Sequence, residues 1–291
     1  MSFDGERANG QLHLRYEDIA QDGRILLQTL PVALGVIWRA ISMPREARSA
    51  MLAQGILPIM TRYVLEAGPG PFAIENALDV QGGFTLAHSV DASGAVDRLY
   101  MDMDAELTGP LGRTNLPPPE TVGTRVFAGR VRAEHVFTKP FAPPGERKVV
   151  TLPMSAEPFV PKAQRAWSVP DRTLEVTTGS PAIDGEYIED PVRFALGVMH
   201  TDSNQHVNSL VYPRIFEEAA LRRFRALGRP TTVLARSIDI AYRRPSFAGD
   251  ALRIFVRAYE NVATGYFFGE TDDTSDIKKA RAFIQMRFEG P

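Results

Sequence analysis

The seven residues from Asp202 to Asn208 combine acid, amide and imidazole side chains in one short run. The run reads Asp-Ser-Asn-Gln-His-Val-Asn, so Asp202, Asn204, His206 and Asn208 stand at alternate positions. A carboxylate can serve as a general base or a nucleophile, and an imidazole can orient water or protonate a leaving group. Asp, Ser and Asn are also ordinary helix caps, but one cap uses one side chain. The combination therefore predicts a site for acyl chemistry, with helix capping as the alternative for any single member.

The segments on either side of this run predict a strand before it and a helix after it. Residues 192–199 are apolar enough for a short strand, and Tyr212, Phe216, Ala220 and Phe224 recur at the helical period. We therefore expect the polar run where the strand turns into the helix. Unpaired backbone N–H groups at a helix start could hold a carbonyl oxygen that gains negative charge.

At these residues the chain resembles a known family. The run from Asp202 to Asn208, with Tyr212 and the Glu217-Glu218 pair after it, is similar to the active-site segment of acyl-ACP thioesterases and, more loosely, of hotdog-fold acyl-CoA thioesterases. The resemblance implies a hotdog fold and hydrolysis of fatty acyl thioesters of acyl carrier protein or CoA. It also implies that Asp202, Asn204 and His206 form the catalytic group.

One motif departs from the family pattern. Acyl-ACP thioesterases place a Glu or Cys directly after a Tyr-Arg-Arg motif, whereas here Tyr242-Arg243-Arg244 is followed by Pro245 and Ser246. Neither residue can serve as a comparable acid or base. A non-catalytic acyl-thioester-binding protein therefore stays open as an alternative. A hotdog enoyl hydratase or dehydratase, which also uses an acid with a His, is the rival among enzymes.

For thioester hydrolysis, we expect the thioester carbonyl to accept the backbone N–H groups of Val207 and Asn208 at the helix start. Asp202 would act as a base toward water or attack directly, and His206 would orient the water or protonate the departing thiol. We predict no metal and no cofactor, because a metal site would need His200, Asp202 and His206 to converge. The residues expected to contact the substrate are Val207, Asn208, Tyr212, Glu217 and Ser246.

The composition excludes several functional classes. The formal net charge of the 291 residues is only -2, with acidic and basic residues intermixed, so nucleic-acid binding is not expected. Cysteine is absent, which removes disulfides and thiolate catalysis and favours a reducing, cytoplasmic location. The strongest membrane candidate, residues 25–41, is short for a bilayer and contains Pro31 and Arg39. We therefore predict a helix buried in protein and no membrane span.

Four arginines cluster toward the end of the helix that follows the polar run. They could meet the phosphates of CoA or the acidic surface of a carrier protein. Cations near a helix C-terminus are also favoured by the helix dipole alone. Both interpretations stay open for Arg222, Arg223, Arg225 and Arg229.

The order of strand, polar turn and helix occurs twice in the chain. In the first half it comprises a predicted strand at 13–16, a polar turn and the apolar helix at 25–41. Strand-like runs joined by tight polar turns follow each helix. We expect these strands at 56–66, 72–80, 83–90, 96–107 and 124–137 in the first half, and at 232–243, 250–259, 265–270 and 278–288 in the second.

The two polar turns differ in chemistry. Setting Asp18 on Asp202 leaves Ala20 and Asp22 at the positions of the amide and the imidazole. On this alignment the first half lacks the catalytic constellation. We therefore expect one active half and one structural half, the latter supplying the wall of an acyl-chain pocket.

Together these elements predict an α+β protein made of two tandem hotdog domains, each a long helix wrapped by an antiparallel β-sheet. Residues 1–138 are expected to form a first, non-catalytic domain, and residues 172–291 a second domain that carries the site. Residues 139–171 are rich in proline and are expected to connect the two, with an extra edge strand at 148–152. The expected partner is an acyl thioester, and a homodimer is left open.

Overall fold

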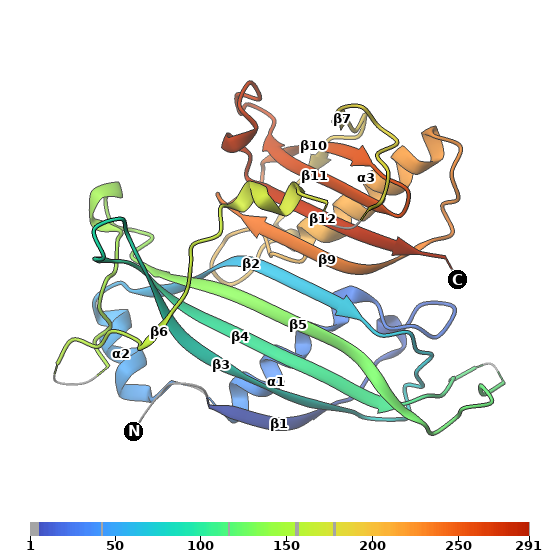
Figure 1. Ribbon diagram of the computed structural model, residues 1–291, viewed down its shortest axis with the longest axis horizontal. Coiled ribbons are helices and arrows are strands. Elements are labelled where there is room, and N and C mark those ends of the chain that lie inside the picture. The colour runs from blue at the N-terminus through green and yellow to red at the C-terminus, as the bar shows by residue number, and fades with distance from the viewer. Residues whose placement is uncertain (1–5, 42, 116, 155–156, 177–178, 291) are drawn as a thin grey trace. The chain divides into compact units, whose positions relative to one another are not determined.

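Most of the regular structure in the chain is β-strand, and the strands belong to two units. The computed structural model describes residues 6–41, 43–115, 117–154, 157–176 and 179–290. Unit 1 comprises Met1–Tyr63 with Ala67–Ser168, and unit 2 comprises Val64–Glu66 with Val169–Pro291. Each unit is α+β, with a helix on a sheet whose long strands are antiparallel (Figure 1).

The sheet of unit 1 has the order β1-β3-β4-β5-β2. Its pairs β1–β3, β3–β4 and β4–β5 are antiparallel, and the two-residue β6 lies parallel to β3. The elements are β1 (Arg7–Leu12), α1 (Val32–Ala40), α2 (Arg45–Ala53), β2 (Leu57–Ala67), β3 (Leu78–Val90), β4 (Val96–Pro110), β5 (Arg125–Thr138) and β6 (Ala163–Gln164).

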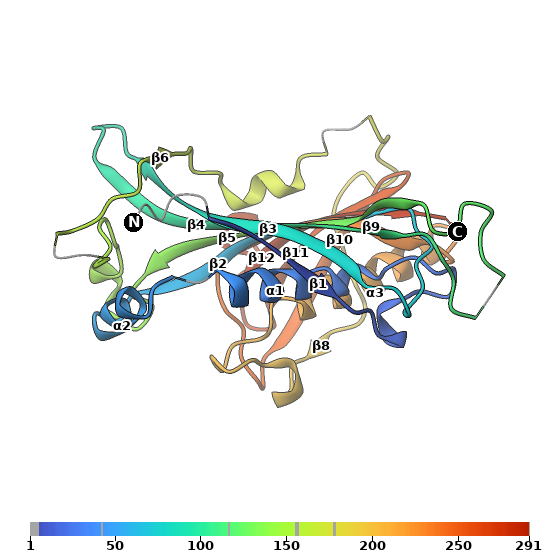
Figure 2. The ribbon, with the colours of Figure 1, turned by 90° about the horizontal axis from the view of Figure 1, so that it is seen from below.

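Helix α1 packs on β1, β3 and β4, and two strand glycines make room for it (Figure 2). A Cβ atom at Gly10 would collide with Val36, and one at Gly82 would lie 2.9 Å from Ile37 Cγ1. Glycine in a strand interior often marks such a close approach. The helix therefore buries its apolar face directly against the backbone of the sheet.

The structure corrects three strands predicted for unit 1. The predicted strand 83–90 is confirmed as part of β3, but the predicted strand 72–80 is wrong in its bounds. Residues 78–90 form one strand, whose internal glycines serve packing rather than a turn. The predicted strand 13–16 is also wrong, since β1 precedes it and Tyr16–Asp18 form a 3-10 turn. Residues 148–152 make only isolated bridges, so the expected edge strand is absent there.

The predicted helix at 25–41 is helical only over Val32–Ala40, apart from one 3-10 turn at Leu27–Thr29. Pro31 stands at the N-cap, where its missing N–H costs nothing because the first helical N–H groups have no partner. The nine residues of α1 make the expectation of a long helix wrong for unit 1. In the described part of the chain, no helix has both the length and the apolar character needed to cross a bilayer.

The sheet of unit 2 has the order β9-β12-β11-β10-β7, and β8 pairs with β10. All of these pairs are antiparallel. The elements are β7 (Ile188–Glu189), β8 (Phe194–Ala195), α3 (Val211–Ala226), β9 (Leu234–Tyr242), β10 (Ala251–Ala258), β11 (Val262–Gly269) and β12 (Ala282–Glu289).

Helix α3 buries the face that its sequence period predicts. Tyr212, Phe216, Ala220 and Phe224 are all buried, and a Cβ atom at Gly265 of β11 would collide with the Phe216 ring. The strand predicted at 192–199 is wrong, because only the two residues of β8 pair with β10 and residues 198–200 form a 3-10 turn.

Candidate active site

The polar run lies on a tight loop that precedes α3. A bridge between Thr201 and Val207 closes the loop, and the Asp202 N–H donates to the carbonyl of His206 at 2.9 Å. The Gln205 N–H donates to the Asp202 carbonyl at 3.0 Å, and Gln205 has a φ of 63°, in the left-handed region. This is the hydrogen-bond pattern of a hairpin turn that ends in a left-handed residue. The expected direct passage from strand to helix is therefore corrected to a closed loop followed by α3.

The three predicted catalytic side chains all lie on this loop. Asp202 and Asn204 are exposed, and His206 is partly exposed with its ring centroid 5.3 Å from that of Phe247. One carboxylate oxygen of Asp202 accepts the Asn204 backbone N–H at 2.8 Å. Within the described residues, the other Asp202 oxygen and the Asn204 amide have no protein partner. The loop thus presents a carboxylate, an amide and an imidazole to solvent.

The backbone N–H groups expected to hold the thioester carbonyl are already engaged. The Val207 N–H donates to the Ser246 carbonyl at 2.8 Å, and the Asn208 N–H donates to the His200 carbonyl at 2.8 Å. The Asn208 side chain accepts the Leu210 N–H at 2.9 Å, just before α3 begins. This corrects the expected backbone donors, because neither N–H is open to a ligand in this structure. Asn208 has the local bond of a turn residue at the helix start.

Two of the predicted substrate contacts lie in the interior beneath the loop. The Tyr212 hydroxyl donates to the Ser246 hydroxyl at 2.8 Å, and the exposed fractions of the two residues are 3% and 0%. Burial raises the pKa of the Tyr212 hydroxyl. The Ser246 carbonyl also accepts the Val207 N–H. Tyr212 and Ser246 together therefore connect the loop to α3 and to the segment after β9.

Arg281 completes this support, and sequence reasoning missed it. Its Nη1 donates to the Ser246 hydroxyl at 3.1 Å and to Asp250 Oδ2 at 2.5 Å, and its Nε donates to Asp272 Oδ2 at 2.8 Å. Hydrogen bonds from Arg281 lower the pKa of Asp272. Residues 246 and 250 precede β10, whereas residues 272 and 281 follow β11, so no spacing pattern in the sequence links the two pairs.

Glu217 is a half-buried carboxylate on α3. Its Oε1 lies 3.4 Å from the Ala235 backbone N–H, a long hydrogen bond, and no cation pairs with it among the described residues. Burial is the main cause that raises the pKa of Glu217, and the neighbouring Glu218 adds to it. A carboxyl group with a raised pKa is better suited to donate a proton than an exposed one.

Replacing Glu217 by Gln should stabilise the protein at neutral pH. Burial disfavours the ionised carboxylate in the folded state, so the destabilising effect is complete above the folded-state pKa and disappears below the unfolded-state pKa. Thermal melts at pH 8 and pH 4 should therefore show a higher Tm for the variant at pH 8 and a smaller difference at pH 4. The matched variant Glu218→Gln, at an exposed position, should show a smaller gain, because it removes only the repulsion that Glu218 exerts on Glu217. A lower Tm for Glu217→Gln at pH 8 would contradict this.

The basic cluster on α3 is largely engaged within unit 2. Arg222 pairs with Asp190, and Arg223 pairs with Asp184. Both carboxylates are almost fully buried, and the bond from Arg223 and one from the Ala258 N–H lower the pKa of Asp184 against the effect of burial. Arg222 and Arg223 therefore hold residues 184–190 on α3. Arg229 donates to the carbonyl of Glu260, whereas Arg225 is exposed and has no partner among the described residues.

Unit 1 contains a loop with the same hydrogen bonds. A bridge between Ile19 and Ile25 closes it, the Ala20 N–H donates to the Arg24 carbonyl at 2.8 Å, and the Gly23 N–H donates to the Ala20 carbonyl at 2.9 Å. Gly23 has a φ of 87°, as the left-handed position requires. The unit 1 loop thus repeats the bridge, both bonds and the left-handed residue of the unit 2 loop.

This repeat corrects the alignment of the two halves by two residues. The matching bridges place Ala20 on Asp202 and Arg24 on His206, so Asp18 does not align with Asp202. Asp18 is buried and accepts bonds from Arg15 and Thr29 instead. The carboxylate and the imidazole both have no counterpart in the unit 1 loop.

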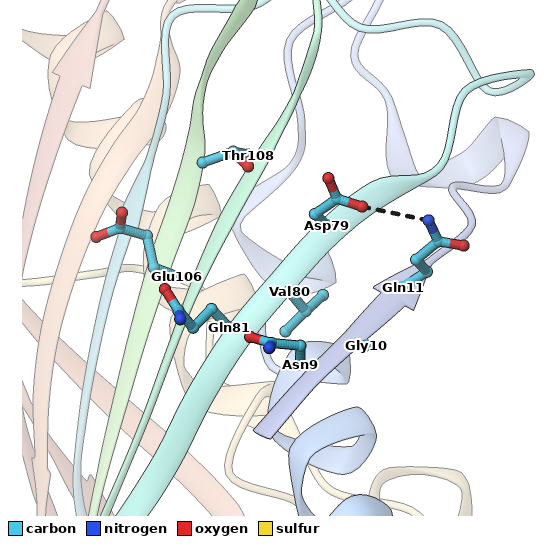
Figure 3. A pocket seen from close by; sticks show the side chains of 8 residues that line it. All are labelled: Asn9, Gly10, Gln11, Asp79, Val80, Gln81, Glu106 and Thr108. Atoms are coloured by element: carbon cyan, nitrogen blue, oxygen red, sulfur yellow. Dashed lines mark hydrogen bonds between the residues drawn. The ribbon is translucent and has the colours of Figure 1, made fainter. Parts of the chain in front are cut away.

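A pocket of about 550 Å³ lies on the strands β1, β3 and β4 of unit 1 (Figure 3). Gln11 donates to Asp79 across it at 3.2 Å, and no imidazole lines it. None of the predicted site residues belongs to this pocket. Among the described residues, no three His, Cys, Asp or Glu side chains are grouped so that they could hold a metal ion. The pocket is lined by Asn9, Gly10, Gln11, Asp79, Val80, Gln81, Glu106 and Thr108.

Comparison with solved structures identifies the fold. The chain is similar to an acyl-ACP thioesterase from Bacteroides thetaiotaomicron, with 14% identity, a TM-score of 0.57 and coverage of 97% of this chain and 98% of that one. It is also similar to the 12:0-ACP thioesterase from Umbellularia californica, with 11% identity, a TM-score of 0.55 and full coverage of both chains. No family model and no curated protein sequence matches the chain. The predicted resemblance to acyl-ACP thioesterases is confirmed at the level of the fold.

Proposed function

We propose that this chain, which has the fold of acyl-ACP thioesterases, hydrolyses fatty acyl thioesters of acyl carrier protein or CoA. One observation supports this most directly: Asp202, Asn204 and His206 stand together on a closed loop at the start of α3. The loop exposes these groups, while buried residues hold its base. A carboxylate, an amide and an imidazole are sufficient to activate water, polarise a carbonyl and protonate a thiolate.

We further propose that the two units are tandem hotdog domains. A helix on an antiparallel sheet occurs in each, and the loop before the helix has the same bridge and the same bonds in both. The proposed domains are residues 1–138, without catalytic groups, and residues 172–291, with the site. The proline-rich residues 139–171 would connect them. The absence of cysteine supports a reducing compartment, and we propose the cytoplasm.

In the proposed mechanism, Asp202 takes a proton from water and the resulting hydroxide adds to the thioester carbonyl carbon. The side-chain N–H groups of Asn204 and His206 replace the occupied backbone N–H groups as donors to the oxyanion. The C–S bond then breaks, and the thiolate receives a proton through His206. Direct attack by Asp202 would pass through an anhydride, which water then hydrolyses to the same acid.

A non-catalytic acyl-binding protein is the second candidate, and two observations favour it. Both backbone N–H groups expected to hold the carbonyl are occupied. Ser246, which follows the Tyr-Arg-Arg motif after which acyl-ACP thioesterases have a Glu or Cys, is fully buried. Without a positioned acid or base, a reaction typically loses about a hundred- to ten-thousandfold in rate. Under this alternative, acyl-CoA would raise the Tm without release of thiol.

Thiol release from a panel of acyl-ACPs and acyl-CoAs tests the proposal. We expect release above the buffer rate with at least one acyl chain, and the rates for matched chains on the two carriers would identify the carrier. Release no faster than in buffer, with a Tm that rises on addition of acyl-CoA, would overturn hydrolysis and support binding. Neither release nor a Tm shift with any acyl thioester would overturn both.

A further inference from the structure

The loop of unit 1, which has no counterparts of Asp202 and His206, borders a pocket of about 320 Å³. Ile19, Ala20 and Gly23 of the loop line this pocket, together with Phe72 and Ile74. Small-molecule sites typically occupy about 300–1,000 Å³, so this pocket is large enough for a short ligand. The further residues that line it are Tyr16, Gln21, Arg113, Thr114 and Asn115.

Direct bonds hold the walls of this pocket together. The Phe72 N–H donates to the Gly23 carbonyl at 2.8 Å, and the Gly112 N–H donates to the Pro71 carbonyl at 3.0 Å. The Thr114 hydroxyl accepts the Ile74 N–H at 3.0 Å and donates to Glu75 at 3.2 Å. Three segments of unit 1 are thus joined around the pocket, which reduces the ordering cost of binding.

The polar groups on the pocket are suited to an anion. Arg113 is the one ionised side chain among the described lining residues, it is exposed, and it has no hydrogen-bond or ion-pair partner in the described part of the chain. The Tyr16 hydroxyl accepts a bond from the Asn115 amide at 2.9 Å, so its own proton remains available. A guanidinium and a phenol together match the two oxygens of a carboxylate.

The remaining surface of the pocket is apolar. Ile19, Ala20, Phe72 and Ile74 carry no side-chain polar atom, and Phe72 is almost fully buried. An ion without a hydrocarbon part would leave this surface in contact with water. A ligand that combines a carboxylate with a short apolar tail would satisfy both parts of the pocket.

We propose that this pocket binds a short-chain monocarboxylate, with the carboxylate on Arg113 and Tyr16 and the hydrocarbon tail against Ile19, Phe72 and Ile74. The site belongs to unit 1 and uses none of the residues proposed for hydrolysis. A failure of the proposed hydrolysis would therefore not affect this proposal, and a failure of this proposal would not affect hydrolysis. Ala20, which stands at the position of Asp202, lies at the pocket wall, where its small side chain keeps the space open.

Isothermal titration calorimetry of the full chain with octanoate, 1-octanol and octylammonium tests this proposal. We expect saturable binding of octanoate, weaker binding of 1-octanol and none of octylammonium, because only the first pairs with a guanidinium. Arg113→Gln should weaken octanoate binding by about tenfold or more, the usual cost of losing a hydrogen bond to a charged group, and should leave 1-octanol unaffected. Ala20→Phe should abolish binding of both by filling the pocket.

Arg132→Gln is the matched control, because Arg132 is an exposed arginine of the same unit outside the pocket. It should leave the octanoate Kd unchanged, and thermal melts should show all three variants folded. An unchanged Kd in Arg113→Gln would overturn the carboxylate assignment. No saturable octanoate binding in the wild-type chain, or wild-type binding in folded Ala20→Phe, would overturn the site itself.

Discussion

Replacing Asp202 by Asn should lower kcat/KM for thioester hydrolysis by about a hundred- to ten-thousandfold, the usual contribution of a positioned acid or base. The amide oxygen of the new side chain can still accept the Asn204 N–H, so the turn of the loop should persist while the carboxylate is lost. Affinity for the acyl ligand should change little, because apolar burial dominates such binding. Initial rates of thiol release and the Tm shift with acyl-CoA measure the two effects separately.

Asp22→Asn is the matched control for this experiment. Asp22 lies on the equivalent loop of unit 1, where it accepts the Arg24 backbone N–H at 3.0 Å, and that loop has neither a counterpart of Asp202 nor an imidazole. Turnover should be unchanged in this variant. An equal loss in both variants, with folding intact, would show that both loops take part in catalysis. Full turnover in Asp202→Asn would place the chemistry outside the loop.

Replacing Phe216 by Ala should destabilise the protein by about 3–5 kcal/mol, the range for a buried phenylalanine. Its ring is fully buried on α3, fits against Gly265 of β11 and lies 6.1 Å from the ring centroid of Phe267. Gly265 has no side chain that could fill the space, so the cavity would remain. Urea unfolding followed by far-UV circular dichroism measures the loss.

Arg225→Ala on the same helix is the control, because Arg225 is exposed and has no partner among the described residues. Its expected effect is within about 0.5 kcal/mol. A loss below about 1 kcal/mol for Phe216→Ala would contradict the packing of α3 on β11 described above.

Local patterns predicted several elements well. The strand expected at 96–107 is β4, the strand at 124–137 is β5, and the strand at 250–259 is β10, each within a few residues. These strands were readable because burial alternates along them, as in β10, where Leu252, Ile254, Val256 and Ala258 are buried. The buried face of α3 was readable for the same reason, at the period of a helix.

Elements that depend on distant contacts were not predicted. The glycine pair inside β3 reads as a turn in the sequence. The close approach of α1 and β4 at Gly82, and of Glu6 and Arg7 at Gly83, explains why these glycines belong to a strand. The alignment of the two polar loops with each other was also not predicted correctly. Identities alone favoured Asp18 on Asp202, whereas the bridges and backbone bonds place Ala20 there.

The sequence by itself determined which chemical groups stand together, since Asp202, Asn204 and His206 are neighbours in one short run and remain on one loop whatever the rest of the chain does. It also determined the resemblance to acyl-ACP thioesterases, which the fold confirms. Only the tertiary structure decided which donors are open to a ligand. The bonds of Val207 and Asn208 go to Ser246 and His200, and hydrogen bonds across such distances follow from folding rather than from local spacing.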